Sequence, residues 1–231
     1  MRVITWNCNM AFRKKAKLIL KETPDVLIVQ ECESLDKLDF LNAPSQFWYG
    51  DNPNKGIGIF TFNGHTLQLM ENHNHDCRFI IPLIVSTANT SFNLFAIWAQ
   101  KSYDGHYTRQ VWKALDYYDI TKGNVLLIGD FNSSSIWDKP NRTTNHSNMV
   151  ERLKLIGIES VYHKFYECEQ GKDLAATLFF YRKRERTYHI DYCFASSNFI
   201  RNLTDIKVGR HDDWVGASDH MPLIIDFENN M

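Results

Sequence analysis

The sequence lacks long apolar runs and paired cysteine motifs. No stretch of about 18 apolar residues occurs, and the opening MRVITWN contains no apolar segment typical of a secretion signal. The five cysteines form no CxxC pair and no zinc-ligand spacing, and their odd number suits free thiols in a reducing compartment better than a disulfide framework. We therefore expect a cytoplasmic protein with no membrane partner and no disulfides.

An excess of charge of one sign is also missing. The chain has 26 Lys and Arg residues against 27 Asp and Glu residues, so its surface is not generally basic, although a local basic patch is still allowed. No Gly-, Ser- or Pro-rich linker, internal repeat or low-complexity tract divides the 231 residues. We expect one domain over residues 1–231, with a sizeable core and a monomeric state.

Short apolar runs, typical of β-strands, recur along the whole chain. They cover residues 3–6, 25–31, 56–62, 78–86, 91–99, 124–129, 187–195 and 222–227. Helical periodicity is limited to residues 12–20, 111–118 and 149–156. Because the strands from residue 56 to residue 99 follow one another directly, hairpins are favoured over strict βα alternation. The pattern predicts an α/β fold with paired mixed sheets and helices packed outside.

Several of the apolar runs end in a carboxylate or an amide. ITWN stops at Asn7, VLIVQE at Glu31, VLLIGDFN at Asp130 and Asn132, and YHID places Asp191 among apolar neighbours. An unpaired buried carboxylate is costly, so these residues imply either exposure at a sheet edge or convergence on a cation. Asp130 and Asn132 would point the same way in an extended chain. One edge of a sheet could hold all of these side chains.

Together with SDH at residues 218–220, these motifs resemble the endonuclease/exonuclease/phosphatase superfamily, which includes exonuclease III and deoxyribonuclease I. GDFN followed by SDHxP about ninety residues later is the most specific part of the pattern, which extends from Asn7 to His220. The resemblance implies a four-layered α/β sandwich, in which two packed mixed β-sheets are flanked by helices. It also implies divalent-metal-dependent cleavage of phosphate esters.

The carboxylates themselves favour a hard divalent cation. Glu31, Asp130, Asp191 and Asp219 would bring four carboxylates near one another, and no Cys/His cluster accompanies them. Such an all-oxygen set suits Mg²⁺ or Mn²⁺ rather than zinc. A cation would also offset the repulsion between these carboxylates and an anionic phosphate ester. Our first expectation is Mg²⁺, with Glu31 as principal ligand and Asn7 and Asp219 as secondary ligands.

The expected reaction is in-line attack of water on phosphorus. Asp130 would orient and deprotonate the water, and Asn132 would hold that water or a non-bridging oxygen. His220, oriented by Asp191, would either stabilise the developing charge or take the proton itself. The sequence does not distinguish Asp130 from His220 as the base.

Three further residues are candidates for substrate binding. Trp98 lies where relatives commonly place a Tyr or His that donates a hydrogen bond to the scissile phosphate, and its alternative role is to end an apolar strand in the core. Arg109 lies in YTRQVW, which is similar to a Y-x-R-Q-x-W stretch in abasic-site endonucleases of the family. Asn148 has two possible roles. It would either contact a phosphate or, with Glu151 three residues later, cap the expected helix at 149–156.

The whole motif set favours a nuclease that acts on DNA, endo- or exonucleolytically. A phosphatase or phosphodiesterase acting on a lipid or small molecule is the alternative, and a non-catalytic binding module would require a missing ligand or histidine. The basic run RKRER at residues 182–186 makes the charge distribution along the chain uneven. This segment would either track a phosphate backbone or form a solvated surface. The short chain leaves little room for duplex-penetrating loops, which argues against abasic-site specificity.

Overall fold

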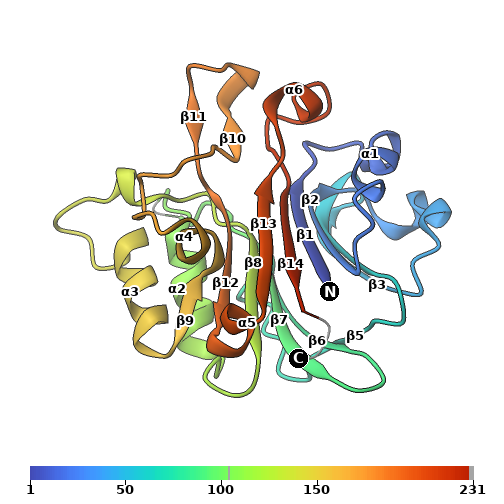
Figure 1. Ribbon diagram of the computed structural model, residues 1–231, viewed down its shortest axis with the longest axis horizontal. Helices are drawn as coiled ribbons and strands as arrows, with labels where there is room; N and C mark the ends of the chain where they lie inside the picture. Colours follow the sequence, from blue (N-terminus) through green and yellow to red (C-terminus); the bar gives the residue numbers. More distant parts are fainter. Residues whose placement is uncertain (104, 229–231) are drawn as a thin grey trace.

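The computed structural model describes residues 1–103 and 105–228 and consists of two six-stranded mixed β-sheets packed face to face (Figure 1). The strand orders are β13-β14-β1-β2-β4-β3 and β5-β6-β7-β8-β12-β9. Each sheet contains one parallel pair, β1–β2 in the first and β7–β8 in the second, among antiparallel neighbours. The predicted pair of mixed sheets is confirmed.

The elements have the following bounds. The first sheet consists of β1 (Arg2–Asn7), β2 (Val26–Cys32), β3 (Ser45–Asn52), β4 (Lys55–Thr61), β13 (Leu203–Val208) and β14 (Leu223–Phe227). The second consists of β5 (Thr66–Leu69), β6 (Ile80–Ser86), β7 (Ser91–Trp98), β8 (Val125–Asp130), β9 (Ile158–Ser160) and β12 (Asp191–Ser196), and a small hairpin is formed by β10 (Leu178–Phe179) and β11 (Thr187–Tyr188).

The α-helices are α1 (Ala16–Leu20), α2 (Thr108–Tyr117), α3 (His146–Leu155), α4 (Val161–Tyr166), α5 (Ser197–Arg201) and α6 (His211–Trp214). Short 3₁₀ turns occur at η1 (Phe12–Lys14), η2 (Leu35–Lys37), η3 (Asp39–Leu41), η4 (Ser135–Trp137) and η5 (Phe180–Arg182). No helix in the described ranges is long and apolar enough to cross a membrane.

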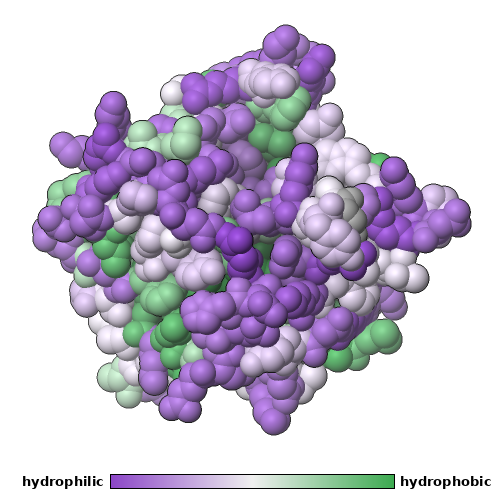
Figure 2. Space-filling model, turned by 180° about the vertical axis from the view of Figure 1, so that it is seen from behind, coloured by the Kyte–Doolittle hydropathy of each residue, from purple (hydrophilic) through white to green (hydrophobic). Residues whose placement is uncertain are grey.

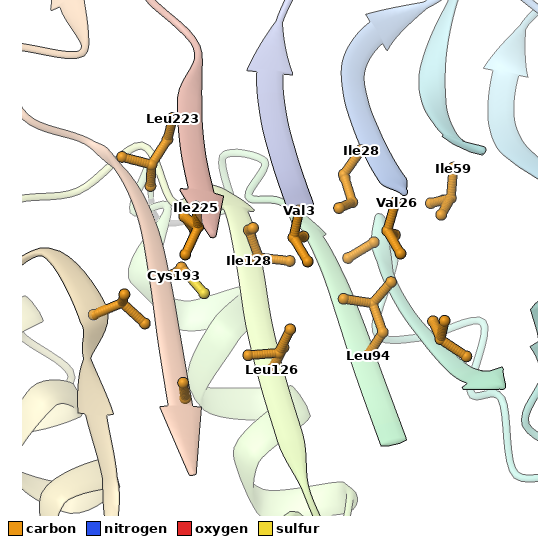
Figure 3. Packing of buried hydrophobic residues seen from close by; sticks show 14 of the residues in the cluster. Val3, Val26, Ile28, Ile59, Leu94, Leu126, Ile128, Cys193, Leu223 and Ile225 are labelled. Carbon is orange, nitrogen blue, oxygen red and sulfur yellow. The ribbon is translucent and has the colours of Figure 1, made fainter. Parts of the chain in front are cut away.

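The main core lies between the two sheets. Val3 and Ile225 from the first sheet face Leu94 and Ile128 from the second, and all four are fully buried (Figure 3). A second apolar cluster packs α2 and α3 on the outer face of the second sheet, and a third packs η1, α1 and α6 on the outer face of the first. These layers form the expected four-layered α/β sandwich. The back of the molecule is mostly hydrophilic, with hydrophobic residues in small separate patches (Figure 2).

The strands that the sequence did not predict lie mainly at sheet edges. β3, β5, β9 and β13 each end a sheet, where one side of the strand pairs with no other strand of the described ranges. Edge strands are partly exposed, so they carry polar residues in place of an apolar run, as in the half-buried SQFWYGDN of β3. Two predicted elements were also wrong in extent: the helix at 12–20 is divided into η1 and α1, and the strand at 187–195 is interrupted between β11 and β12.

Candidate active site

The polar strand ends meet at one edge of the sandwich, the upper edge in Figure 1. β1 ends at Asn7 and β8 ends at Asp130, whereas the antiparallel β12 begins at Asp191 and β14 follows directly after the segment of His220. The carboxyl ends of the first two strands and the amino ends of the other two therefore lie on the same side. In the ladder between β8 and β12, Asp130 and Asp191 are direct partners.

Asp130 is the most tightly held carboxylate at this edge. Its Oδ2 accepts hydrogen bonds from the side-chain amides of Asn7 and Asn132, each 3.0 Å long, and its Oδ1 accepts one of 2.9 Å from the backbone N–H of Asn132. The residue is completely buried. These three donors fix the orientation of the carboxylate without adding any charge.

Asn132 reaches Asp130 by a backbone conformation that the sequence did not predict. Its φ is 49°, in the left-handed region, so the segment after β8 turns instead of continuing as an extended chain. The expectation that an extended backbone would point Asp130 and Asn132 the same way was wrong. The turn nevertheless places the Asn132 amide on Asp130 and lets it donate to the carbonyl of Ala99 at 3.1 Å.

His220 and Asp191 form a buried pair beside Asp130. His220 Nδ1 lies 2.9 Å from Asp191 Oδ2, and both side chains are almost completely buried. The backbone N–H of Asp191 donates to Thr177 Oγ1, which fixes the start of β12. Ser218 fixes the position of His220, because its hydroxyl accepts a hydrogen bond from the backbone N–H of His220 and donates one to the carbonyl of Asn7.

Burial and neighbouring charges strongly shift the pKa values of Asp130 and His220. Burial and the nearby charge of Asp191 together raise the pKa of Asp130 to about 7, against the opposing effects of the His220 charge and of the hydrogen bonds from Asn7 and Asn132. Burial alone would lower the pKa of His220, but the charge and hydrogen bond of Asp191, with smaller contributions from Asp130 and Asp219, raise it to about 10. The site thus combines a carboxylate that takes a proton near neutrality with an imidazole that keeps one.

Glu31 and Asp219 are the two remaining predicted carboxylates, and each has a polar partner of its own. Glu31 sits at a β-bulge in β2 with a φ of 57°, and its carboxylate contacts the ammonium of Lys55 at 3.4 Å. Asp219 precedes His220 and accepts a hydrogen bond of 2.9 Å from the side chain of Asn9. Asn9 in turn donates its backbone N–H to Asn7 Oδ1, so Asp219 is connected through Asn9 to the Asn7–Asp130 pair.

The donor set fits a hard divalent cation. Ligand atoms of Asp130, Asp191 and His220 all lie within 4.8 Å of one another. Asp191 Oδ1 is buried and has no hydrogen-bond partner among the described residues, which is costly for a carboxylate oxygen unless a cation or solvent satisfies it. Asn7, bonded to Asp130, and Asp219, next to His220 in the chain, add further oxygens, whereas Glu31 lies outside this group of three residues. Such a mostly oxygen set is the chemistry that Mg²⁺ and Mn²⁺ prefer.

The three candidate substrate-binding residues lie in different surroundings. Trp98 belongs to the inter-sheet core, is 5% exposed and packs edge-on against Phe79 with the ring centroids 4.9 Å apart. Its Cα is the ladder partner of Asp130, and the ammonium of Lys55 lies 5.4 Å from its ring centroid. Arg109 is exposed on α2 with its guanidinium over the ring of Tyr103.

Asn148 does not cap the helix, so the predicted helix start was wrong. α3 begins at His146, and Asn148 lies inside its first turn, exposed, with its side chain donating to the carbonyl of Thr143 at 2.9 Å. The carboxylate of Asp138 instead accepts from the backbone N–H groups of His146 and Ser147. Asp138 comes from the preceding loop, so local sequence spacing gave no signal for this cap.

Asn9, Ser218 and Lys55 contact the predicted site residues but were not predicted from the sequence. Ser218 and Asn9 stand two residues from His220 and Asn7, so proximity in the sequence was the available signal. Lys55 had no such signal, because the antiparallel pairing of β2 and β4 brings it to Glu31.

Comparisons with known proteins place this geometry in context. The family model described as "Endonuclease/Exonuclease/phosphatase family" matches residues 4–220. A search of the curated proteins gave no match. Similar solved structures include an AP endonuclease from Archaeoglobus fulgidus (16% identity, TM-score 0.68, covering 99% of both chains). A second is the endonuclease domain of TRAS1, a telomere-specific non-LTR retrotransposon (15% identity, TM-score 0.69, covering 100% of this chain and 99% of that one). A third is the 3'-5' exonuclease NExo from Neisseria meningitidis (17% identity, TM-score 0.68, covering 99% of this chain and 100% of that one).

Proposed function

Because the chain belongs to the endonuclease/exonuclease/phosphatase family, whose members hydrolyse phosphate esters with the help of divalent metals, we propose that it is a nuclease that cleaves the phosphodiester bonds of DNA. The observation that carries the proposal is the buried cluster at one sheet edge, where Asn7 and Asn132 hold Asp130 while Asp191 holds His220. An oriented base beside an oriented acid is what hydrolysis of a phosphate ester requires.

Asp130 is the group that takes the proton from the attacking water. Its two oxygens are fixed by three N–H donors, so the carboxylate does not have to reorient during the reaction. Asn132 holds the water or a non-bridging oxygen beside it. Donors aligned in advance on a buried carboxylate reduce the reorganisation needed in the transition state.

His220 supplies positive charge to the phosphoryl oxygens in this proposal. Asp191 fixes Nδ1 of the ring, which leaves the opposite nitrogen to donate to the negative charge that develops on the phosphate. This division of roles makes Asp130 the base and His220 the stabilising acid. Asp191 acts through His220 and is a positioning residue.

Glu31, Asn7 and Asp219 would hold the metal, with Mg²⁺ preferred and Mn²⁺ able to replace it. When bound, the cation neutralises charge on the phosphate ester and polarises its phosphorus–oxygen bonds. Replacing Glu31 with Gln removes a charged ligand and little volume, so Glu31→Gln should need a higher metal concentration for turnover while its melting temperature stays the same. The matched control is Glu159→Gln, at a surface ion pair on β9.

DNA is the proposed substrate for two reasons. Similar folds include an AP endonuclease, a retrotransposon endonuclease and a 3'-5' exonuclease. In addition, the β10–β11 hairpin beside the site carries Arg182, Lys183, Arg184 and Arg186, all exposed, together with exposed Phe180 and Tyr181. Cations and aromatic rings side by side are the usual means of holding nucleic acid strands.

A substrate panel tests the proposed function directly. The protein is incubated with plasmid DNA, single-stranded DNA, RNA, a phosphomonoester and a small phosphodiester, each with Mg²⁺, Mn²⁺ or a chelator. The proposal predicts metal-dependent cleavage of DNA and none in the chelator. Turnover of the phosphomonoester alone would instead identify a phosphatase, and equal cleavage in the chelator would contradict metal dependence.

A further inference from the structure

A cavity of about 390 Å³ opens beside the candidate active site, between the ends of β3 and β4 in the first sheet and of β6 and β7 in the second. Lys55 and Trp98 are part of its lining and also contact the site, since Lys55 touches Glu31 and Trp98 is the ladder partner of Asp130. A substrate bound at Asp130 could therefore extend directly into this cavity.

The charge of the cavity is positive, in contrast to the acidic site next to it. Among the residues that the structure describes, the charged lining residues are Lys55, Arg78 and Lys101 together with the carboxylate of Asp51. Arg78 pairs with Asp51, but both side chains are at least half exposed, so solvent screens the pair strongly. In the described part of the lining, cations thus outnumber carboxylates at the mouth of a site that must attract an anion.

Each of the three cations is held over an aromatic ring. The ammonium of Lys55 lies 5.4 Å from the ring centroid of Trp98, and the ammonium of Lys101 lies 5.7 Å from that of Tyr107. The guanidinium of Arg78 lies 5.6 Å from the ring centroid of the adjacent Phe79. A ring face attracts a cation and limits its movement without cancelling its charge. The three charges are thus oriented while they stay available to an anionic ligand.

Of the three cavity cations, Lys55 directly contacts a candidate site residue. It begins β4 opposite the bulge that contains Glu31, and its Nζ lies 3.4 Å from Glu31 Oε1. Its side chain is 42% exposed, so the ammonium is open to a ligand. Trp98, in contrast, is too buried to stack on a base and serves as the platform beneath Lys55.

We propose that this cavity binds the phosphates of a nucleic acid strand on one side of the scissile bond. Lys55 contacts the scissile phosphate, while Arg78 and Lys101 bind the phosphates that follow along the strand. The inference rests on the proposed nuclease function and makes it more specific, because a small phosphate ester has no following phosphates. It also assigns to Lys55 the contact with the scissile phosphate that was expected from Trp98.

The experiment compares one long and one short substrate. Lys55→Met, Arg78→Gln and Lys101→Met are assayed with Mg²⁺ on a DNA oligonucleotide and on bis(p-nitrophenyl) phosphate, and Lys113→Met, at an exposed ion pair on α2, is the control. Arg78→Gln and Lys101→Met should raise the KM for the oligonucleotide about tenfold and leave the small diester unaffected. Lys55→Met should lower turnover of both substrates.

Binding without turnover separates this inference from the proposed function. In chelator, affinity for a fluorescent oligonucleotide should fall about tenfold in each of the three variants, and each should flatten the salt dependence by about one ion. Replacing one backbone phosphate with a neutral methylphosphonate should weaken binding to the wild type but not to the variant that lacks its partner cation.

The two possible failures look different. If the three variants bind and cleave the oligonucleotide like Lys113→Met, the cavity is not a phosphate site, even if the wild type is an active nuclease. If the variants lose binding as expected but the wild type cleaves no nucleic acid with any metal, the nuclease proposal fails and the phosphate-binding cavity stands. Equal losses on both substrates by Arg78→Gln and Lys101→Met would also overturn the inference.

Discussion

The side-chain amide of Asn7 donates a hydrogen bond of 3.0 Å to Oδ2 of Asp130, and this bond joins the two sheets at the edge where the candidate site lies. Asn7 ends β1 in the first sheet and Asp130 ends β8 in the second. The proposed base therefore takes its orientation from both halves of the sandwich. Sheet packing and the geometry of the reaction are directly connected through these two residues.

Removing this bond should slow the reaction with little effect on folding. A hydrogen bond to a charged group contributes about 1.5–3 kcal/mol, so Asn7→Ala should lower kcat by roughly 10- to 100-fold. Steady-state kinetics and a melting curve measure the two effects. Asn93→Ala is the control, since the Asn93 side chain bonds to the Lys122 carbonyl on a distant loop. Turnover of Asn7→Ala within twofold of this control would contradict the proposed link.

The Asp191–His220 pair predicts a shift in the pH profile. With Asp191 present, the pKa of His220 is raised to about 10, so the imidazole keeps its proton through neutral pH. In Asp191→Asn the raising charge is lost while burial still favours the neutral ring, so His220 should lose its proton at lower pH. The alkaline limb of kcat/KM should therefore move to lower pH.

A second histidine–aspartate pair provides the control for that experiment. His163 lies on α4, and its Nε2 is 2.8 Å from Oδ1 of Asp173. Asp173→Asn should leave the alkaline limb in place. An alkaline limb that is the same in Asp191→Asn, Asp173→Asn and the wild type would remove the proposed role of Asp191.

Buried His146 predicts a loss of stability in acid. Burial lowers the pKa of His146 from 6.5 to about 4, so protonation favours the unfolded chain. Its contribution is complete above about pH 6.5 and is lost as the pH falls toward 4, which amounts to about 2 kcal/mol at pH 5. Urea unfolding at pH 7.5 and pH 5 should show a smaller loss in His146→Gln than in the wild type.

The control for acid stability is the exposed His75. His75→Gln should lose as much stability between the two pH values as the wild type does. If His146→Gln loses just as much, acid sensitivity comes from other groups and the interpretation of His146 is wrong.

The basic hairpin predicts a non-specific contribution to DNA binding. Lys183 and Arg186 are exposed there, whereas Arg184 pairs with Asp212 and Arg182 bonds to the Gly216 carbonyl. Replacing Lys183 and Arg186 with Ala should weaken binding to all sequences alike and reduce the salt slope by about two. The control replaces Lys122 and Lys207, each in a surface ion pair away from the hairpin. The same slope in both double variants would exclude the hairpin as a phosphate contact.

The sequence predicted the parts of the fold that are buried on both faces. β1, β2, β7 and β8 lie inside the sandwich and are continuous apolar runs, which makes them visible in the sequence. The edge strands β3 and β13 carry polar residues along their exposed sides and were missed. The motif residues were found because polar groups that directly follow buried strands are conspicuous.

Features that depend on contacts between distant parts of the chain could not be predicted from the sequence. The bulge at Glu31, the left-handed φ of Asn132 and the position of Lys55 over Trp98 all depend on strand register and on turns without a characteristic residue pattern. The cap of α3 by Asp138 likewise comes from a loop eight residues before His146. Local periodicity carries no information about such contacts.

The most direct test of the whole account is the single-turnover rate of Asp130→Asn with a DNA oligonucleotide and saturating Mg²⁺. We expect a loss of about 10²–10⁴-fold in this rate, with a cooperative melting transition that shows the variant to be folded. Asp116→Asn, at an exposed ion pair on α2, should react like the wild type. Cleavage by Asp130→Asn at the rate of this control would contradict the central claim that the Asp130 cluster carries out the chemistry.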